Sequence, residues 1–155
     1  MDLVLNIQNT VSDSDIPSKY RFKKWASAVL NCHEVPKKLE LSIRITDVAE
    51  IKQLNGQYRK KDKPTNVLSF PSEIPEDFLL NTHYLGDIVI CASVVRKEAK
   101  EQGKELMAHW AHMTLHGILH LLEYDHENDH DAAVMEKMEV DLLAELGYPN
   151  PYNES

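Results

Sequence analysis

Residues 116–126 of this chain read HGILHLLEYDH, and three of them are histidines at a spacing that can surround one metal ion. His116 and His120 are four positions apart, so on a helix their imidazoles lie on the same face. His126 follows the polar stretch 123–125, where the helix can end and the chain can turn back. A catalytic zinc uses three protein ligands and leaves a fourth position to water. The sequence therefore predicts one zinc ion per chain, bound by His116, His120 and His126.

His112 lies on the same helical stripe and is the competing ligand. With a rise of about 1.5 Å per residue, His112 and His120 are roughly 12 Å apart along the axis, too far to share one ion at bonds of about 2 Å. We therefore expect His112 to lie behind the ligands, to face the substrate or to belong to the core. The other histidines carry weaker signals: packing for His109, a solvated helix start for His130, and none for His33 and His83.

Composition is typical of a small intracellular enzyme. The chain has 155 residues and is 43% hydrophobic, which is enough for one domain, spanning 1–155, with a proper core. Cys32 and Cys91 form no CxxC pair, so neither a disulfide framework nor a thiolate zinc site is indicated. We see no signal peptide and no apolar run long enough for a membrane helix. A cytoplasmic location and no membrane partner are the resulting expectations.

Charge is distributed unevenly along the chain. Residues 121–155 hold ten acidic residues and one lysine, whereas residues 52–63 carry five basic side chains against Asp62. Such a basic cluster is either a solvated turn or a patch that contacts phosphates. The pI of about 5.4 argues against non-specific coating of nucleic acid, but it is compatible with a cleft that binds a few phosphates.

The hydrophobic pattern predicts a four-stranded sheet covered by helices, an α+β fold. Alternating apolar residues or short apolar runs predict strands over 3–7, 39–45, 66–70 and 85–90. Helical spacing and capping residues predict helices from Pro17 to about 30, from Asp47 onward, and over about 92–102, 105–122 and 129–146. The segment 72–84 is predicted to be the longest loop.

Several segments together resemble the bacterial YbeY endoribonuclease family. They are HGILHLLEYDH, the preceding AHWAHMTLHG, YRKKDKPTNVLSFP at 58–71, and LGDIVIC at 85–91. The resemblance implies a zincin-like single domain, a zinc ion on the three histidines, and a functional role for Arg59. It also implies an RNA substrate, maturation of small-subunit ribosomal RNA with ribosome quality control, and the ribosome small subunit or its assembly factors as partners. The oligomeric state stays open.

Three positions depart from related patterns. Gly117 stands where the zincin protease pattern H-E-x-x-H-x-x-G-x-x-H has its catalytic glutamate. Glu123 stands where the metal motif commonly has glycine, which costs roughly 1–2 kcal/mol if the backbone is left-handed there. We expect the fold to tolerate this cost, although the carboxylate could instead lie near the metal or bind an imidazole nitrogen that faces away from it. Asn66 replaces the aspartate of many family members.

The predicted chemistry is metal-dependent cleavage of a phosphodiester bond. Arg59 would stabilise negative charge on the phosphoryl oxygens, while Lys61 and Lys63 would hold flanking phosphates. The sequence does not choose between direct attack by an activated water and attack by a 2′-hydroxyl. Two alternatives remain: a zinc hydrolase of another bond such as a peptide, and a ribosome-associated binding protein with a structural zinc.

Overall fold

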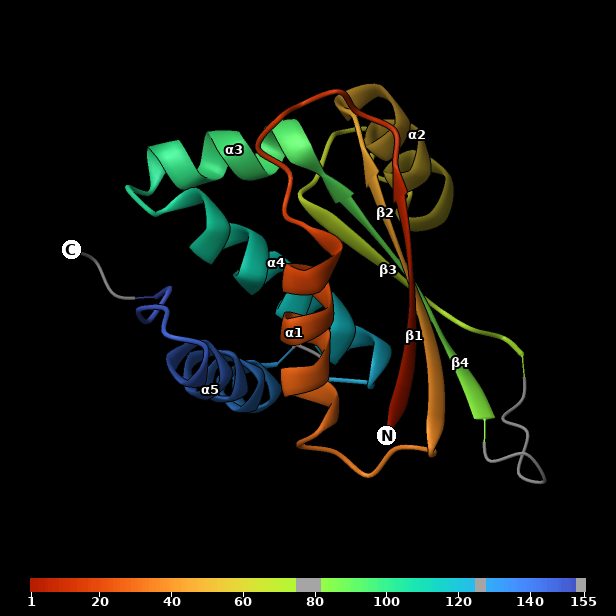
Figure 1. The fold of residues 1–155 in the computed structure, drawn as a ribbon. Coiled ribbons are helices and arrows are strands. Elements are labelled where there is room, and N and C mark those ends of the chain that lie inside the picture. Colours follow the sequence, from red (N-terminus) through yellow and green to blue (C-terminus); the bar gives the residue numbers. More distant parts are fainter. Residues whose placement is uncertain (75–81, 125–127, 153–155) are drawn as a thin grey trace.

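The computed structural model describes residues 1–74, 82–124 and 128–152, which form a four-stranded sheet with helices on both faces (Figure 1). The strands are β1 (Asp2–Asn9), β2 (Lys38–Thr46), β3 (Val67–Pro71) and β4 (Thr82–Cys91). The helices are α1 (Lys19–Leu30), α2 (Val48–Arg59), α3 (Ala92–Glu101), α4 (Leu106–Leu121) and α5 (Asp129–Glu145). The predicted α+β class and four-stranded sheet are confirmed. No helix in the described ranges is long and apolar enough to cross a membrane.

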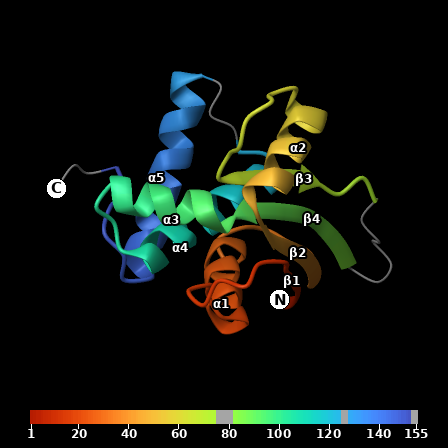
Figure 2. The same ribbon diagram turned by 90° about the horizontal axis from the view of Figure 1, so that it is seen from above.

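The sheet has the strand order β1-β2-β4-β3. β1 and β2 are parallel, as are β2 and β4, whereas β3 runs antiparallel to β4 and forms one edge. Figure 2 shows this order from above, with α2 next to β3 and α1 next to β1. An edge strand has one side unpaired within the sheet. β3 and β1 are the two edge strands, and the residues of β3 line a cleft described below.

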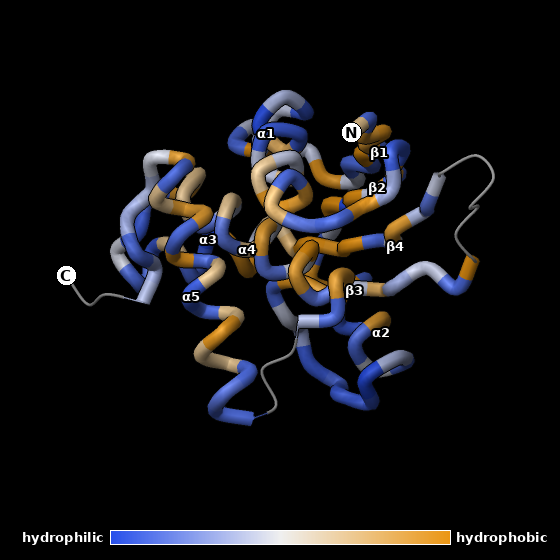
Figure 3. The backbone as a smooth tube through the Cα atoms, turned by 90° about the horizontal axis from the view of Figure 1, so that it is seen from below, coloured by the Kyte–Doolittle hydropathy of each residue, from blue (hydrophilic) through white to orange (hydrophobic). Residues whose placement is uncertain are grey.

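Alternation along the central strand β4 divides the core into two parts. Ile88 and Ile90 are buried in the large cluster under α1, α4 and α5, while Val89 and Cys91 point to a smaller cluster under α2. A strand covered on both faces reads as a continuous apolar run, which explains the sequence signal at 85–90. In Figure 3 the hydrophobic stretches gather along the sheet and the helices that face it.

One boundary prediction was wrong. β4 begins at Thr82, so the last residues of the predicted loop 72–84 belong to the strand. The pairing with β2 shifts register after Tyr84, and Gly86 has a φ of 144°. This bulge interrupts the alternation by which a strand is recognised. Residues 75–81 of the predicted loop lie outside the described residues.

Helix caps follow the local sequence closely. Asp47 accepts a hydrogen bond from the Glu50 backbone N–H at 2.9 Å, as a capping residue should. Ser18 caps α1 in the same way, one residue after the predicted start at Pro17. α2 ends at Arg59, and the capping residue Lys60 that follows it has a left-handed φ of 57°. This sharp stop turns the basic segment away from the helix axis.

Candidate metal centre

Helix α4 carries four histidines from the core toward the protein surface. His109 and His112 are buried, with 2% and 6% of their surface exposed, whereas His116 and His120 are partly exposed near the helix end. The Nε2 atoms of His116 and His120 lie 3.1 Å apart. Two nitrogens bound to one tetrahedral zinc at about 2.0–2.1 Å would be separated by about 3.3–3.4 Å. The two imidazoles therefore already have nearly the spacing that a shared zinc ion requires.

Glu139 of α5 holds His116 from behind. Its carboxylate is completely buried and lies 3.2 Å from His116 Nδ1. A carboxylate only accepts hydrogen bonds, so Nδ1 carries the proton and the Nε2 lone pair is directed toward His120. Metal-binding histidines are commonly oriented by such a carboxylate on the second ring nitrogen. The arrangement selects the ring nitrogen that a metal needs.

Two further donors satisfy the same carboxylate. His112 Nε2 donates to Glu139 at 2.8 Å, and the Tyr152 hydroxyl donates at 2.8 Å. Burial opposes the charge of Glu139, but the hydrogen bonds from His112 and His116 outweigh it and lower its pKa to about 2. Burial lowers the pKa of His112 and raises that of Tyr152, which favours the neutral form of both donors. A buried anion surrounded by neutral donors is well suited to balance a cation bound at His116.

A second grouping on α4 and α5 can also bring three ligand atoms together. One ligand atom each from His112, His116 and Glu139 lies within 4.8 Å of the other two. This grouping shares His116 with the predicted set but uses two buried side chains, His112 and Glu139, in place of His120 and His126. Its burial resembles a closed structural site more than an open catalytic one. A possible metal centre at this end of α4 is therefore present in either description, and His116 belongs to both.

The third predicted ligand, His126, lies outside the described residues, but the turn that leads to it is defined. Glu123 has a φ of 72°, so the left-handed backbone considered in the sequence analysis is present. The Glu123 N–H donates to His120 O and the Tyr124 N–H to Leu119 O, both at 3.0 Å. These two bonds form a Schellman motif, which normally favours glycine at the left-handed position. The Glu123 side chain is exposed and belongs to the cleft wall.

His33, which carried no signal in the sequence, supports this turn. Its Nδ1 donates to Val29 O at 2.7 Å, so its Nε2 accepts from the Tyr124 hydroxyl, 2.9 Å away. The two residues are 91 positions apart in the sequence. This separation explains why no local pattern could reveal the contact. His33 thereby connects the loop after α1 to the turn that precedes His126.

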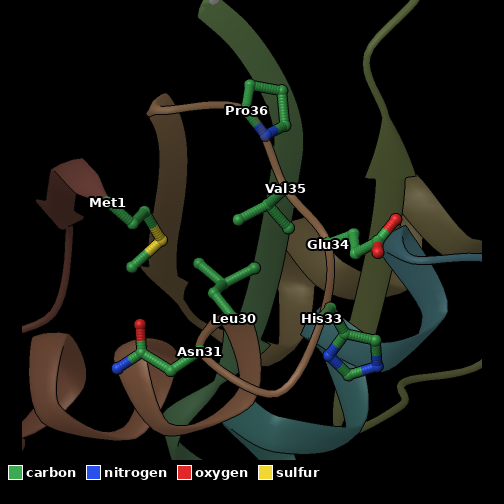
Figure 4. Close-up of a pocket in the computed structure, with 7 residues that line it drawn as sticks. All are labelled: Met1, Leu30, Asn31, His33, Glu34, Val35 and Pro36. Atoms are coloured by element: carbon green, nitrogen blue, oxygen red, sulfur yellow. The ribbon is translucent and has the colours of Figure 1, made fainter.

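His33 also borders a cavity of about 580 Å³ beside the loop after α1 (Figure 4). The side chains of Met1, Leu30 and Val35 extend toward one another in this view, and His33 lies apart from them. The described bonds of the His33 ring nitrogens are to Val29 and Tyr124. The imidazole is thus engaged in holding the turn, and this cavity offers few groups for chemistry.

The histidines open onto a cleft of about 1080 Å³ between the end of α2, strand β3 and the end of α4. Its walls include Arg59, Lys61, His116 and His120. The predicted basic turn and the histidine motif are therefore brought together, although they are distant in the sequence. Lys63 is in the same turn but is not among the residues that line the cleft.

A buried side chain holds the basic turn in place. Asn55 is 1% exposed and donates from Nδ2 to Lys63 O at 2.9 Å. Its own backbone carbonyl accepts from the Lys61 N–H at 3.2 Å. These bonds close the chain back onto α2 immediately after Arg59. The basic side chains are consequently presented from a defined turn rather than from a loose loop.

The packing around Gly117 leaves little room for the glutamate that proteases have at this position. A Cβ atom at this position would lie 3.1 Å from Ile88 Cγ2 and 3.2 Å from Val67 Cγ2. The Ser69 hydroxyl also donates to Gly117 O at 2.8 Å, which fixes the helix against β3. The position is filled by the sheet, so a glutamate there would have to displace core side chains.

Asn66, the other departure from the family pattern, pairs with a carboxylate. Its Nδ2 donates to Glu98 Oε1 at 3.1 Å, and its Oδ1 accepts from the Val67 N–H at 2.7 Å. Glu98 also accepts from His109 Nε2 at 2.9 Å, a bond that lowers the pKa of Glu98 against the effect of burial. An aspartate at position 66 would place a second negative charge beside Glu98. The amide is the better partner in this chain.

Comparisons with known proteins agree with the resemblance seen in the sequence. The solution structure of TM1509 from Thermotoga maritima is similar over 93% of this chain and 92% of that chain, with 24% identity and a TM-score of 0.57. At that identity the likeness establishes the shared α+β fold alone. The model of the family described as endoribonuclease YbeY matches residues 6–147. Because this match covers most of the sequence and includes both the basic turn and the histidine motif, the chain belongs to the YbeY endoribonuclease family.

Proposed function

We propose that this protein, as one domain, is a zinc-dependent endoribonuclease that cleaves single-stranded segments during maturation and quality control of small-subunit ribosomal RNA in the cytoplasm. Family membership supports an endoribonuclease. The observation that carries the proposal is the 3.1 Å approach of the His116 and His120 Nε2 atoms in a cleft also lined by Arg59. We assign one zinc ion to His116, His120 and His126, because this set keeps the metal at the cleft rather than in the core.

The metal ligands, Glu139 and the basic turn then each have a chemical task. A bound zinc ion supplies Lewis acidity and lowers the pKa of a coordinated water. Glu139 keeps His116 in the tautomer that presents Nε2 to the cleft. Attack by water and attack by a 2′-hydroxyl both increase negative charge on the same phosphoryl oxygens, and Arg59 donates to those oxygens. Lys61 contacts a neighbouring phosphate, and Lys63 extends this contact from the outer part of the turn.

Gly117 weighs against the alternative of peptide hydrolysis. A zincin protease uses the glutamate at this position as general base, and here the position is packed against Ile88 and Val67. RNA cleavage requires a binding site for phosphates, which the basic turn provides. Rates should therefore fall as salt rises, because the contacts between the lysines and the phosphates are screened.

The test is cleavage of structured RNA with single-stranded loops by purified protein free of other nucleases. Arg59→Glu should fold and bind zinc normally but cut RNA about a hundred to a thousand times more slowly, because a preorganised donor is lost. Arg59→Lys should recover part of the rate, since it keeps the charge without the planar fork. An unchanged rate in the folded, metal-loaded Arg59→Glu protein would exclude Arg59 from the mechanism.

Two further outcomes separate the alternatives. Zinc-dependent hydrolysis of peptides with RNA left intact would replace the proposed activity with that of a protease. Normal association with the ribosome small subunit or its assembly factors, without any cleavage, would instead make the protein a binding factor with a structural zinc. A fourth protein ligand closing the metal site would point to the same conclusion.

A further inference from the structure

The cleft contains an aromatic side chain that the chemistry above leaves unused. Tyr58 is 61% exposed and lies in the cleft wall beside Arg59 and Lys61. Burying an aromatic ring is normally favourable, so a ring left this open in a concave site is available for a ligand. Tyr20, on α1, is also exposed, at 76%, but is not among the residues that line the cleft. Tyr58 is therefore a candidate ligand contact because of its position in the cleft, and not because of its exposure alone.

The Tyr58 ring is held in a defined orientation. Its centroid lies 5.1 Å from that of Phe70 on β3, and the ring planes are inclined at 70°. Phe70 is itself partly buried against the cluster of Ile51, Leu68, Val89 and Cys91. This edge-to-face contact connects Tyr58 to the core through Phe70 while leaving much of its ring surface exposed. A ring oriented in this way can accept a planar ligand with little loss of side-chain entropy.

The neighbouring charges indicate which planar ligand fits. Arg59 and Lys61 follow Tyr58 in the sequence and line the same cleft, so a flat aromatic surface stands next to groups suited to phosphates. A nucleotide combines both features, and every base offers a π face to an aromatic side chain. Within an A-form duplex those faces are occupied by neighbouring bases, so only an unpaired base can stack on Tyr58.

We propose that Tyr58, supported by Phe70, forms a stacking subsite for one unpaired nucleobase next to the phosphate that Arg59 contacts. This inference rests on the proposed function, because it assumes a nucleic-acid strand in the cleft. It adds a base contact to the phosphate contacts of the basic turn. The subsite positions the strand and does not take part in bond cleavage.

The test compares the binding of two probes to the zinc-loaded protein by fluorescence anisotropy. One is a single-stranded DNA octamer, and the other is an abasic octamer with the same sugar-phosphate chain. The wild type should bind the base-bearing octamer more tightly, with stacking on Tyr58 contributing about 5-fold to 150-fold. Tyr58→Ala should lose that part of the difference, while Tyr58→Trp and the control Tyr20→Ala should retain it. Abasic binding should be equal in all four proteins.

Cleavage kinetics provide a second readout. For RNA, Tyr58→Ala should raise KM and change kcat little, since stacking is present before and during the reaction. Unchanged preference for the base-bearing octamer in Tyr58→Ala would overturn the subsite even if RNA is cut as proposed. Loss of that preference together with an inability of the wild type to cut RNA would retain the subsite and reject the nuclease. The two proposals can therefore fail separately.

Discussion

The two halves of helix α4 use the same residue type in different ways. In the first half, His109 and His112 are buried, and each donates to a carboxylate, Glu98 and Glu139 respectively. In the second half, His116 and His120 reach the cleft and bring their Nε2 atoms within 3.1 Å of each other. The spacings, three residues in the first pair and four in the second, both place side chains on one helix face, so spacing alone does not tell the pairs apart. The difference lies in burial and in which ring nitrogen meets the carboxylate. That nitrogen is Nε2 in His109 and His112 but Nδ1 in His116.

The comparison also shows how the two halves cooperate. Glu139 accepts from His112 on one side and from His116 on the other, so the buried half sets the orientation of the open half. Glu98, by contrast, links His109 to Asn66 and does not contact the histidine pair at the cleft in any described hydrogen bond. Two similar histidine–carboxylate pairs thus differ in whether they reach the candidate metal centre.

The largest expected effect comes from removing a histidine of the open half. His120→Ala should reduce zinc affinity by more than the 10-fold to 100-fold that loss of an orienting partner costs. Replacing His109 by glutamine keeps a donor for Glu98 and should leave the zinc content unchanged. Zinc can be measured by metal analysis after dialysis against a weak chelator. Retention of zinc by His120→Ala, with loss in His112→Gln, would move the ion to the His112, His116 and Glu139 grouping.

A second experiment compares the two carboxylates. Glu139→Gln should weaken zinc binding about 10-fold to 100-fold, because His116 loses its charged acceptor. Glu98→Gln is the matched control and should leave the zinc dissociation constant within about two-fold of the wild type, since its histidine partner is not a predicted ligand. Competition with a chromophoric chelator gives both values. Equal weakening in the two variants would mean that the carboxylates act through general stability.

The sequence predicts most of the fold because the signals are local. The capping Asp47, the alternation over 39–45 and the apolar run at 85–90 each depend on neighbours in the chain, and the elements appear within a few residues of their predicted bounds. β4 is the exception, since the bulge at Gly86 breaks the pattern on which the prediction relied.

The candidate site is less accessible to sequence reasoning. The motif indicates ligands, but their supporting contacts join residues far apart: Glu139 lies 27 positions from His112, and Tyr124 lies 91 from His33. Such contacts arise from the packing of α5 and the α1 loop against α4. The ligand set and the roles of Arg59, Lys61 and Lys63 remain predictions.

A third prediction concerns the pH dependence of stability and tests the pair formed by His109, in the buried half of α4, and Glu98. The hydrogen bond from His109 lowers the pKa of Glu98 below its ordinary value of 4.5. A lowered folded-state pKa adds stability above the unfolded pKa, and this stability is lost as the pH falls below 4.5 through the folded value. Metal-free wild type should therefore lose more unfolding free energy between pH 6 and pH 3 than Glu98→Gln does. Parallel pH profiles in urea unfolding would show that Glu98 carries no such linkage.

The smallest effect is expected from Tyr152, which contributes one of the hydrogen bonds to Glu139. Tyr152→Phe removes the hydroxyl that donates at 2.8 Å, but His112 and His116 continue to donate to the carboxylate. The loss should lower the free energy of unfolding by about 1.5–2 kcal/mol, the lower part of the range for a bond to a charged group. Zinc affinity should fall by less than in Glu139→Gln, because His116 keeps its acceptor. Urea unfolding and chelator competition test both points, with Tyr20→Phe as the exposed control. A loss of zinc as large as that of Glu139→Gln would mean that the C-terminal segment, and not the carboxylate alone, orients the histidine.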